Sequence, residues 1–171
     1  MEYQVDARNH HTQEVRVGRD SQEVAVFRKA GFLIYNLEGE VDGIHYQMKL
    51  PAPWTGFRYR LRQGEDELAS AKKQNRMHAF EPDRPLIRHR LVEFVLDIHG
   101  RTHRLVPEDR HGHTYVIREG EEQRGRLAMR TLEAQLAGPW QADLQSPEDW
   151  SVPLAAFVAW LAREGRSGMG S

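Results

Sequence analysis

The chain has 171 residues, a formal net charge of −1 and no cysteine. This length fits one domain, and the near-neutral charge excludes the strong positive field that draws a protein to nucleic acid. The absence of cysteine excludes disulfides, thiolate zinc sites and cysteine nucleophiles. The N-terminus has neither a basic start nor an apolar run, and no stretch has the roughly 18 apolar residues of a membrane span. We therefore expect a cytoplasmic protein without signal peptide or transmembrane segment.

Apolar and polar residues alternate over most of the chain, as in strands with one buried face. Strands are predicted, in chain order, over residues 24–27, 32–37, 44–50, 57–62, 67–74, 91–98, 114–117, 126–129 and 140–144. Segment 67–74 also has helical propensity, but its length and setting favour a strand. The Asp42-Gly43 pair is a hairpin signal. Spacings of about ten residues predict an antiparallel meander, sandwich or barrel of about a dozen strands.

The end of the chain changes character. Residues Ser146 to Asp149 match a capping box, and residues 152–164 are apolar on every side up to Gly165. We predict one helix, at about 147–164, that completes a single domain of residues 1–164, with a flexible tail at 165–171. A surface helix would carry a polar face, so this helix is expected to be enclosed by protein. At about 20 Å it is too short for the ~30 Å hydrocarbon core of a membrane.

A meander of about twelve strands followed by one hydrophobic helix resembles the tubby C-terminal-like superfamily, which includes tubby proteins, phospholipid scramblases and LURP-one-related proteins. The segment that carries the likeness runs from Trp140 to Leu144 and on into residues 152–164. The resemblance implies a mainly β fold, an antiparallel barrel that encloses its C-terminal helix. It also implies binding rather than catalysis, since tubby domains engage phosphoinositide head groups through basic side chains. The chain lacks the membrane anchor and cysteine cluster of scramblases.

Basic side chains recur on the outer faces of the predicted strands. Arg58, Arg60 and Arg62 share one face, because residues two apart along a strand point the same way. Arginine binds phosphate oxygens bidentately and stays charged. The candidate ligand-binding residues are Arg58, Arg60, Arg62, Lys72, Arg88 and Arg90. The alternative is a solvated outer face, the commoner situation for charged residues, balanced by Glu65, Asp66, Glu67 and Glu93.

Two groups of histidines are candidates for a metal site. His99 and His103 flank Gly100, and His111 and His113 lie near Asp109. Such sets hold zinc in some proteins, but no spacing here matches a closed structural site, so we expect no metal. Nor does the chain contain a phosphate-binding loop, a nucleophile elbow or a zinc-protease motif, so we expect no catalytic residue and no cofactor.

Trp54 lies in a loop that Pro51, Pro53 and Gly56 define. An exposed tryptophan there would suit a ligand or a membrane interface. Tryptophan is usually well buried, however, so we expect Trp54 to pack beneath its own loop.

Three hypotheses for function remain open. The first is a non-enzymatic binding module for an anionic lipid or another phosphate-bearing ligand, cytoplasmic and peripheral to the membrane. The second is a calycin-like barrel, a carrier or small enzyme whose internal cavity holds an apolar molecule. The third is an oligomeric scaffold in which the helix packs against a partner chain. The position of residues 152–161 discriminates between the first two, because a helix inside the barrel fills the cavity.

Overall fold

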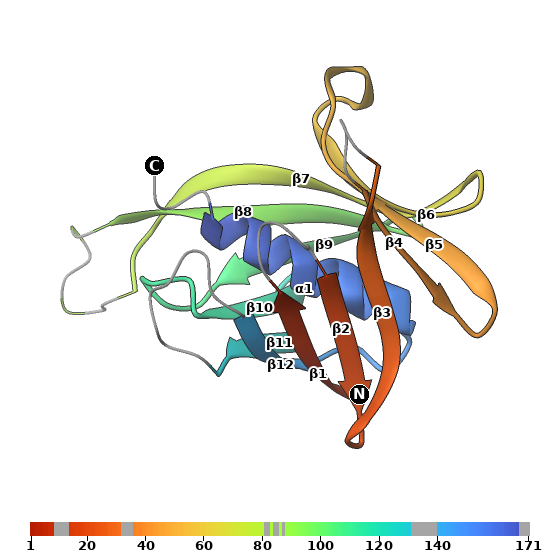
Figure 1. Cartoon of the computed structure of the whole chain (residues 1–171). Coiled ribbons are helices and arrows are strands. Elements are labelled where there is room, and N and C mark those ends of the chain that lie inside the picture. The colour runs from red at the N-terminus through yellow and green to blue at the C-terminus, as the bar shows by residue number, and fades with distance from the viewer. Residues whose placement is uncertain are drawn as a thin grey trace.

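A computed structural model describes residues 1–8, 14–31, 36–80, 83, 86, 88–130 and 140–167. Its strands form a closed antiparallel barrel in which each strand pairs with its neighbours in the chain and β1 closes the ring against β12 (Figure 1). The twelve strands are β1 (Glu2–Arg8), β2 (Glu14–Arg19), β3 (Gln22–Ala30), β4 (Asn36–Val41), β5 (Ile44–Lys49), β6 (Arg58–Gln63), β7 (Asp66–His78), β8 (His89–Ile98), β9 (Arg101–Pro107), β10 (Thr114–Glu119), β11 (Glu122–Met129) and β12 (Trp140–Gln145). The predicted fold class is confirmed.

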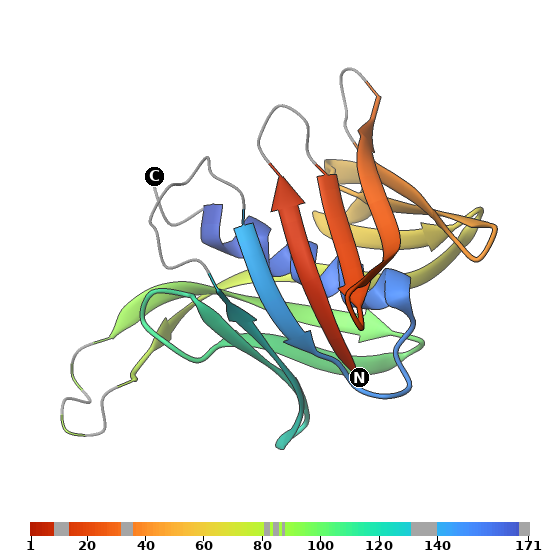
Figure 2. The ribbon, with the colours of Figure 1, turned by 60° about the horizontal axis from the view of Figure 1, so that its bottom comes forward.

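One helix of the described chain, α1 (Val152–Ser167), lies inside the ring of strands (Figure 2). Every residue from Ala155 to Ala162 is 0% exposed, so the helix is covered on all sides. It packs against β1, β2 and β12 as well as against β6 and β8. The enclosed helix is therefore confirmed, and it fills the space that an apolar ligand of a calycin-like barrel would need. No described helix has the length and apolarity to cross a membrane.

The bounds of the helix differ from the prediction at both ends. The capping box was wrong: residues 146–150 form a turn in which the Trp150 amide donates to the Pro147 carbonyl at 3.2 Å, and the helix begins at Val152. Gly165 does not stop the helix, which continues to Ser167. A Cβ at Gly165 would lie 2.9 Å from a ring carbon of Phe94 and 3.1 Å from the Tyr115 hydroxyl. Position 165 therefore requires glycine because Phe94 and Tyr115 leave no room for a side chain, and not because the helix ends there. Residues 168–171 of the predicted tail lie outside the described residues.

The two ends of the barrel differ in their connections. At one end each hairpin turns in two residues, at 20–21, 42–43, 64–65, 99–100 and 120–121. Asp42 and Gly43 both have positive φ, at 53° and 76°, which confirms the hairpin that this pair predicted. At the other end the connections are longer, at 9–13, 31–35, 50–57, 79–88, 108–113 and 130–139. Residues 32–35 of the predicted strand 32–37 are outside the described residues. Binding residues tend to lie on long loops held by a rigid scaffold, so the long-connection end is the first place to look for them.

Candidate functional site

Four basic side chains gather on the outer face of β5, β6 and β7. Tyr59 and Leu61 of β6 point into the core, so the residues between and beside them point outward. Strand register sets Arg58 opposite Lys72 and Arg60 opposite Lys49. Directly opposed residues have Cβ atoms about 4.5–5.5 Å apart, and like charges in that position destabilise a sheet. We call Lys49, Arg58, Arg60 and Lys72 the cationic patch.

The patch is not neutralised by the described part of the chain. None of its four side chains forms a hydrogen bond or ion pair with a described residue, and the Nε atom of Arg60 is buried without a hydrogen-bond partner. Arginines elsewhere on the barrel behave differently, since Arg126 bonds to Glu108 of the β9–β10 connection and Arg130 bonds to Asp143 of β12. The patch is therefore a place where the fold keeps opposed cations without acidic partners.

Four acids were expected to balance this face, and none of them pairs with a patch residue. Asp66 and Glu67 are exposed and form no ion pair with a described residue. Glu65 pairs with Arg62, whose guanidinium also donates to the Glu65 backbone oxygen at 2.8 Å. Glu93 is 0% exposed and accepts a 2.7 Å hydrogen bond from Arg104. Asp97 lies beyond Ser70, two strands from Arg60, and accepts a hydrogen bond from the Gly100 amide.

The other predicted basic residues do not join the patch. Arg62 is on the same face but is engaged by Glu65. Arg90 lies opposite Met77 near the start of β8. Val95, the residue opposite Lys72, is five positions further along β8, and residues an odd number apart point to opposite faces, so Arg90 is on the face away from the patch. Arg88 is exposed in the connection before β8. Lys49 was missed, although it is an outward residue of the strand predicted at 44–50.

Beside the patch, the β5–β6 connection projects from the barrel (upper part of Figure 1). It carries two exposed aromatic side chains. Trp54 is 76% exposed and Phe57 is 63% exposed. The expectation that Trp54 packs beneath its loop is wrong. Residues 53–55 form a 3-10 turn, η1 (Pro53–Thr55), which holds the indole outward.

Backbone hydrogen bonds fix this loop. The Ala52 carbonyl accepts from the Thr55 amide at 3.0 Å and from the Phe57 amide at 3.1 Å. Phe57 has φ of 57°, a left-handed conformation that costs a residue with a Cβ on the order of 1–2 kcal/mol. The loop therefore holds an exposed aromatic residue, directly before Arg58, at a cost in strain.

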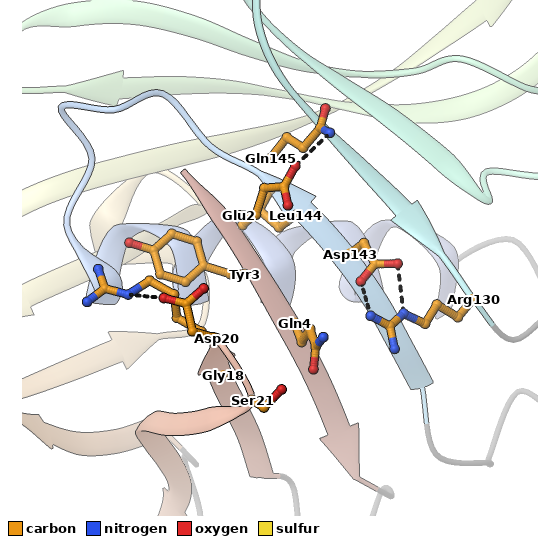
Figure 3. A pocket seen from close by; sticks show the side chains of 11 residues that line it. Glu2, Tyr3, Gln4, Gly18, Asp20, Ser21, Arg130, Asp143, Leu144 and Gln145 are labelled. Atoms are coloured by element: carbon orange, nitrogen blue, oxygen red, sulfur yellow. Dashed lines mark hydrogen bonds and ion pairs between the residues drawn. The ribbon is translucent and has the colours of Figure 1, made fainter.

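A hollow of the described surface lies elsewhere, on the outer face of β1 beside β2 and β12 (Figure 3). It measures about 450 Å³. Its arginines already have partners: Arg130 donates through two nitrogens to Asp143, and Arg19 lies 3.9 Å from Asp20. Its charges are thus satisfied within the fold, and it lacks the unpaired cations that a phosphate group requires.

The histidines form no metal site among the described residues, where no group of three metal-ligating side chains comes together. His111 and His113 stack with ring centroids 5.4 Å apart. Asp109 accepts hydrogen bonds from the backbone amides of His111, His113 and Thr114, at 2.8, 3.3 and 2.7 Å. The Asp109 carboxylate therefore stabilises the β9–β10 connection by accepting hydrogen bonds from its backbone amides.

These hydrogen bonds predict a pH-dependent contribution of Asp109 to stability. Burial tends to raise the pKa of Asp109, but the three amide donors outweigh it and hold the pKa below its ordinary value of 3.8. A lowered pKa in the folded state stabilises the fold above that ordinary value, and the contribution is lost as the pH falls through the folded-state pKa. Asp109→Asn should cost about 1 kcal/mol at neutral pH, a value reduced for partial exposure, and progressively less as the pH falls below 3.8. Urea unfolding of both proteins at several pH values measures the difference; a gap that does not shrink in acid contradicts the assignment.

A scan against protein-family models, a search of curated proteins and a search of solved structures each found no match to the chain.

Proposed function

We propose that the chain is a non-enzymatic binding module that holds a phosphate-bearing anion, a lipid head group or a soluble polyphosphate, on the cationic patch. The observation that carries the proposal is the pairing of like charges, Arg58 with Lys72 and Arg60 with Lys49, without acidic partners among the described residues. Such pairs weaken the free protein. A bound anion removes the repulsion and gives the buried Nε of Arg60 an acceptor. The binding energy of the anion therefore includes both the relieved repulsion and the new hydrogen bond.

The architecture supports the same proposal. A barrel built around a C-terminal helix is the arrangement expected of the tubby C-terminal-like superfamily, whose tubby members engage phosphoinositides through basic side chains. In this proposal the protein works in the cytoplasm, at the periphery of a membrane when the anion is a lipid. The absence of cysteine accords with a reducing compartment.

Charge reversal at Arg58 separates binding from folding. Arg58→Glu would place a carboxylate opposite Lys72, so the variant should be as stable as the parent or more stable by up to about 0.5 kcal/mol. Its affinity for inositol trisphosphate, or for phosphatidylcholine vesicles that contain phosphatidylserine or phosphatidylinositol bisphosphate, should fall about tenfold to thirtyfold. Titration calorimetry and vesicle co-sedimentation at low and physiological salt measure the change, and binding should weaken with salt.

The matched control is Arg126→Glu, which changes the net charge equally on β11, away from the patch. Its affinity should stay within about twofold of the parent, because the patch is intact. Equal losses in the two variants would mean that net charge alone draws the anion, which contradicts a site at the patch. An absence of binding to every one of these probes contradicts the proposed function itself.

A further inference from the structure

We infer that the patch works on a bilayer, and that the β5–β6 connection inserts Trp54 and Phe57 among the head groups of an anionic membrane. The inference rests on the proposed function and names the source of the anion. Trp54 and Phe57 are the only aromatic side chains among the large hydrophobic residues exposed in the described chain, and both lie in the connection that leads into Arg58. A soluble phosphate would contact the cations alone and gives no account of two exposed rings beside them.

The chemistry of the two side-chain types fits a lipid surface. Aromatic rings, tryptophan above all, partition to the boundary between head groups and hydrocarbon, where one part of the ring is apolar and the other is hydrated. Cations beside them meet the negative surface of the membrane. Trp54 and Phe57 supply the first element, and Arg58 with Lys72 supplies the second.

The loop is also built in advance for this contact. Its hydrogen bonds to the Ala52 carbonyl and the left-handed Phe57 fix the backbone before any partner arrives. Little conformational entropy is then lost on insertion, which raises affinity. Backbone strain at a phenylalanine that is 63% exposed points to a role outside the folded core.

The position in the fold agrees with this role. The loop belongs to the long-connection end of the barrel, whereas Met1 and Ile44, which are less exposed at 44% and 40%, lie at the end with two-residue turns. Ile44 therefore offers a control for any effect of merely removing an exposed apolar side chain.

Tryptophan fluorescence of the full chain tests the insertion. Trp140, Trp150 and Trp160 are 5%, 5% and 0% exposed, so a change on vesicle binding reports Trp54. With vesicles of phosphatidylcholine and phosphatidylserine we expect a blue shift, and quenching when the phosphatidylcholine is brominated. The double variant Trp54→Ser/Phe57→Asn should bind these vesicles about tenfold more weakly or worse. Its affinity for inositol trisphosphate should be unchanged. Asparagine accepts the left-handed conformation, so this variant should fold at least as well as the parent.

The outcomes separate the two proposals. Vesicle binding without a change in Trp54 emission, or with full affinity in the double variant, would overturn the insertion. Binding of inositol trisphosphate but not of vesicles would overturn the bilayer and leave the proposed function standing. Binding of neither would overturn both. Ile44→Ser should bind vesicles like the parent, and a loss there equal to that of the double variant would also count against the loop.

Discussion

Phe157→Asp should leave no cooperatively folded protein. Phe157 is 0% exposed and lies with its ring centroid 6.1 Å from that of Trp160, in the middle of the helix that the barrel surrounds. An aspartate there must either bury an unpaired charge or take up a proton, and the ring volume is lost as well. We expect a cost of at least about 5 kcal/mol, which equals much of the stability of an ordinary domain. Circular dichroism during thermal unfolding should show no transition at the parent temperature.

The control for this variant is Phe157→Leu, which removes part of the ring without adding charge. It should fold and lose only about 1–2 kcal/mol, because a hydrophobic replacement of similar size is tolerated in a core. A soluble Phe157→Asp protein with the parent melting temperature would show that the helix is not enclosed, contrary to the fold described above.

Nine of the twelve strands were predicted from the sequence, and the longest apolar patterns were the clearest. β5 and β8 have such patterns, and the ambiguous segment 67–74 is indeed a strand, within β7. β1, β2 and β9 were not predicted individually. Their signals were present but short: Val15 and Val17 are the buried residues of β2, and the buried positions of β9 include His103, a polar side chain in a place where the pattern requires an apolar one.

The enclosed helix was predictable because a segment that is apolar on every side must be covered by protein. The residues at which the helix begins and ends were not predictable. A capping box and a glycine are local signals that give a start and a stop only when tertiary contacts agree. Here Pro147 belongs to a turn, and Gly165 stays helical since Phe94 and Tyr115 leave no room for a side chain.

Part of the candidate site was predictable from the sequence. Alternation showed that Arg58 and Arg60 share a face, but only strand order brings Lys49 and Lys72 opposite them. Exposure of Trp54 depends on η1 and on the left-handed residue after it, neither of which composition reveals. The prediction that Glu93 balances the basic face was wrong. It assumed that a charged residue at an outward position is solvated, whereas Glu93 is buried.

Glu93 points away from the helix yet is covered. Its neighbours on the outer face are Arg104, whose Nε donates at 2.7 Å, Arg76 at 3.9 Å and His78 at 4.0 Å. Burial lowers the pKa of His78, and the nearby charge of Glu93 opposes that effect only in part. Arg104 is thus the one described side chain that donates a hydrogen bond to this carboxylate, and 40% of that arginine remains exposed.

Arg104→Met should therefore cost about 3 kcal/mol, because it leaves the Glu93 carboxylate buried without its hydrogen bond while Arg76 compensates only in part. Glu93→Gln should cost less, about 1 kcal/mol, since the freed guanidinium can reach water. The double variant Arg104→Met/Glu93→Leu should recover most of the loss, as apolar replacements of a buried ion pair often do. Urea unfolding of the parent and the three variants measures these differences. A double variant no more stable than Arg104→Met would mean that Arg104 acts by covering β8 and β9 rather than by pairing with Glu93. The cationic patch is untouched in this series, so binding of anionic vesicles should stay at the parent level throughout.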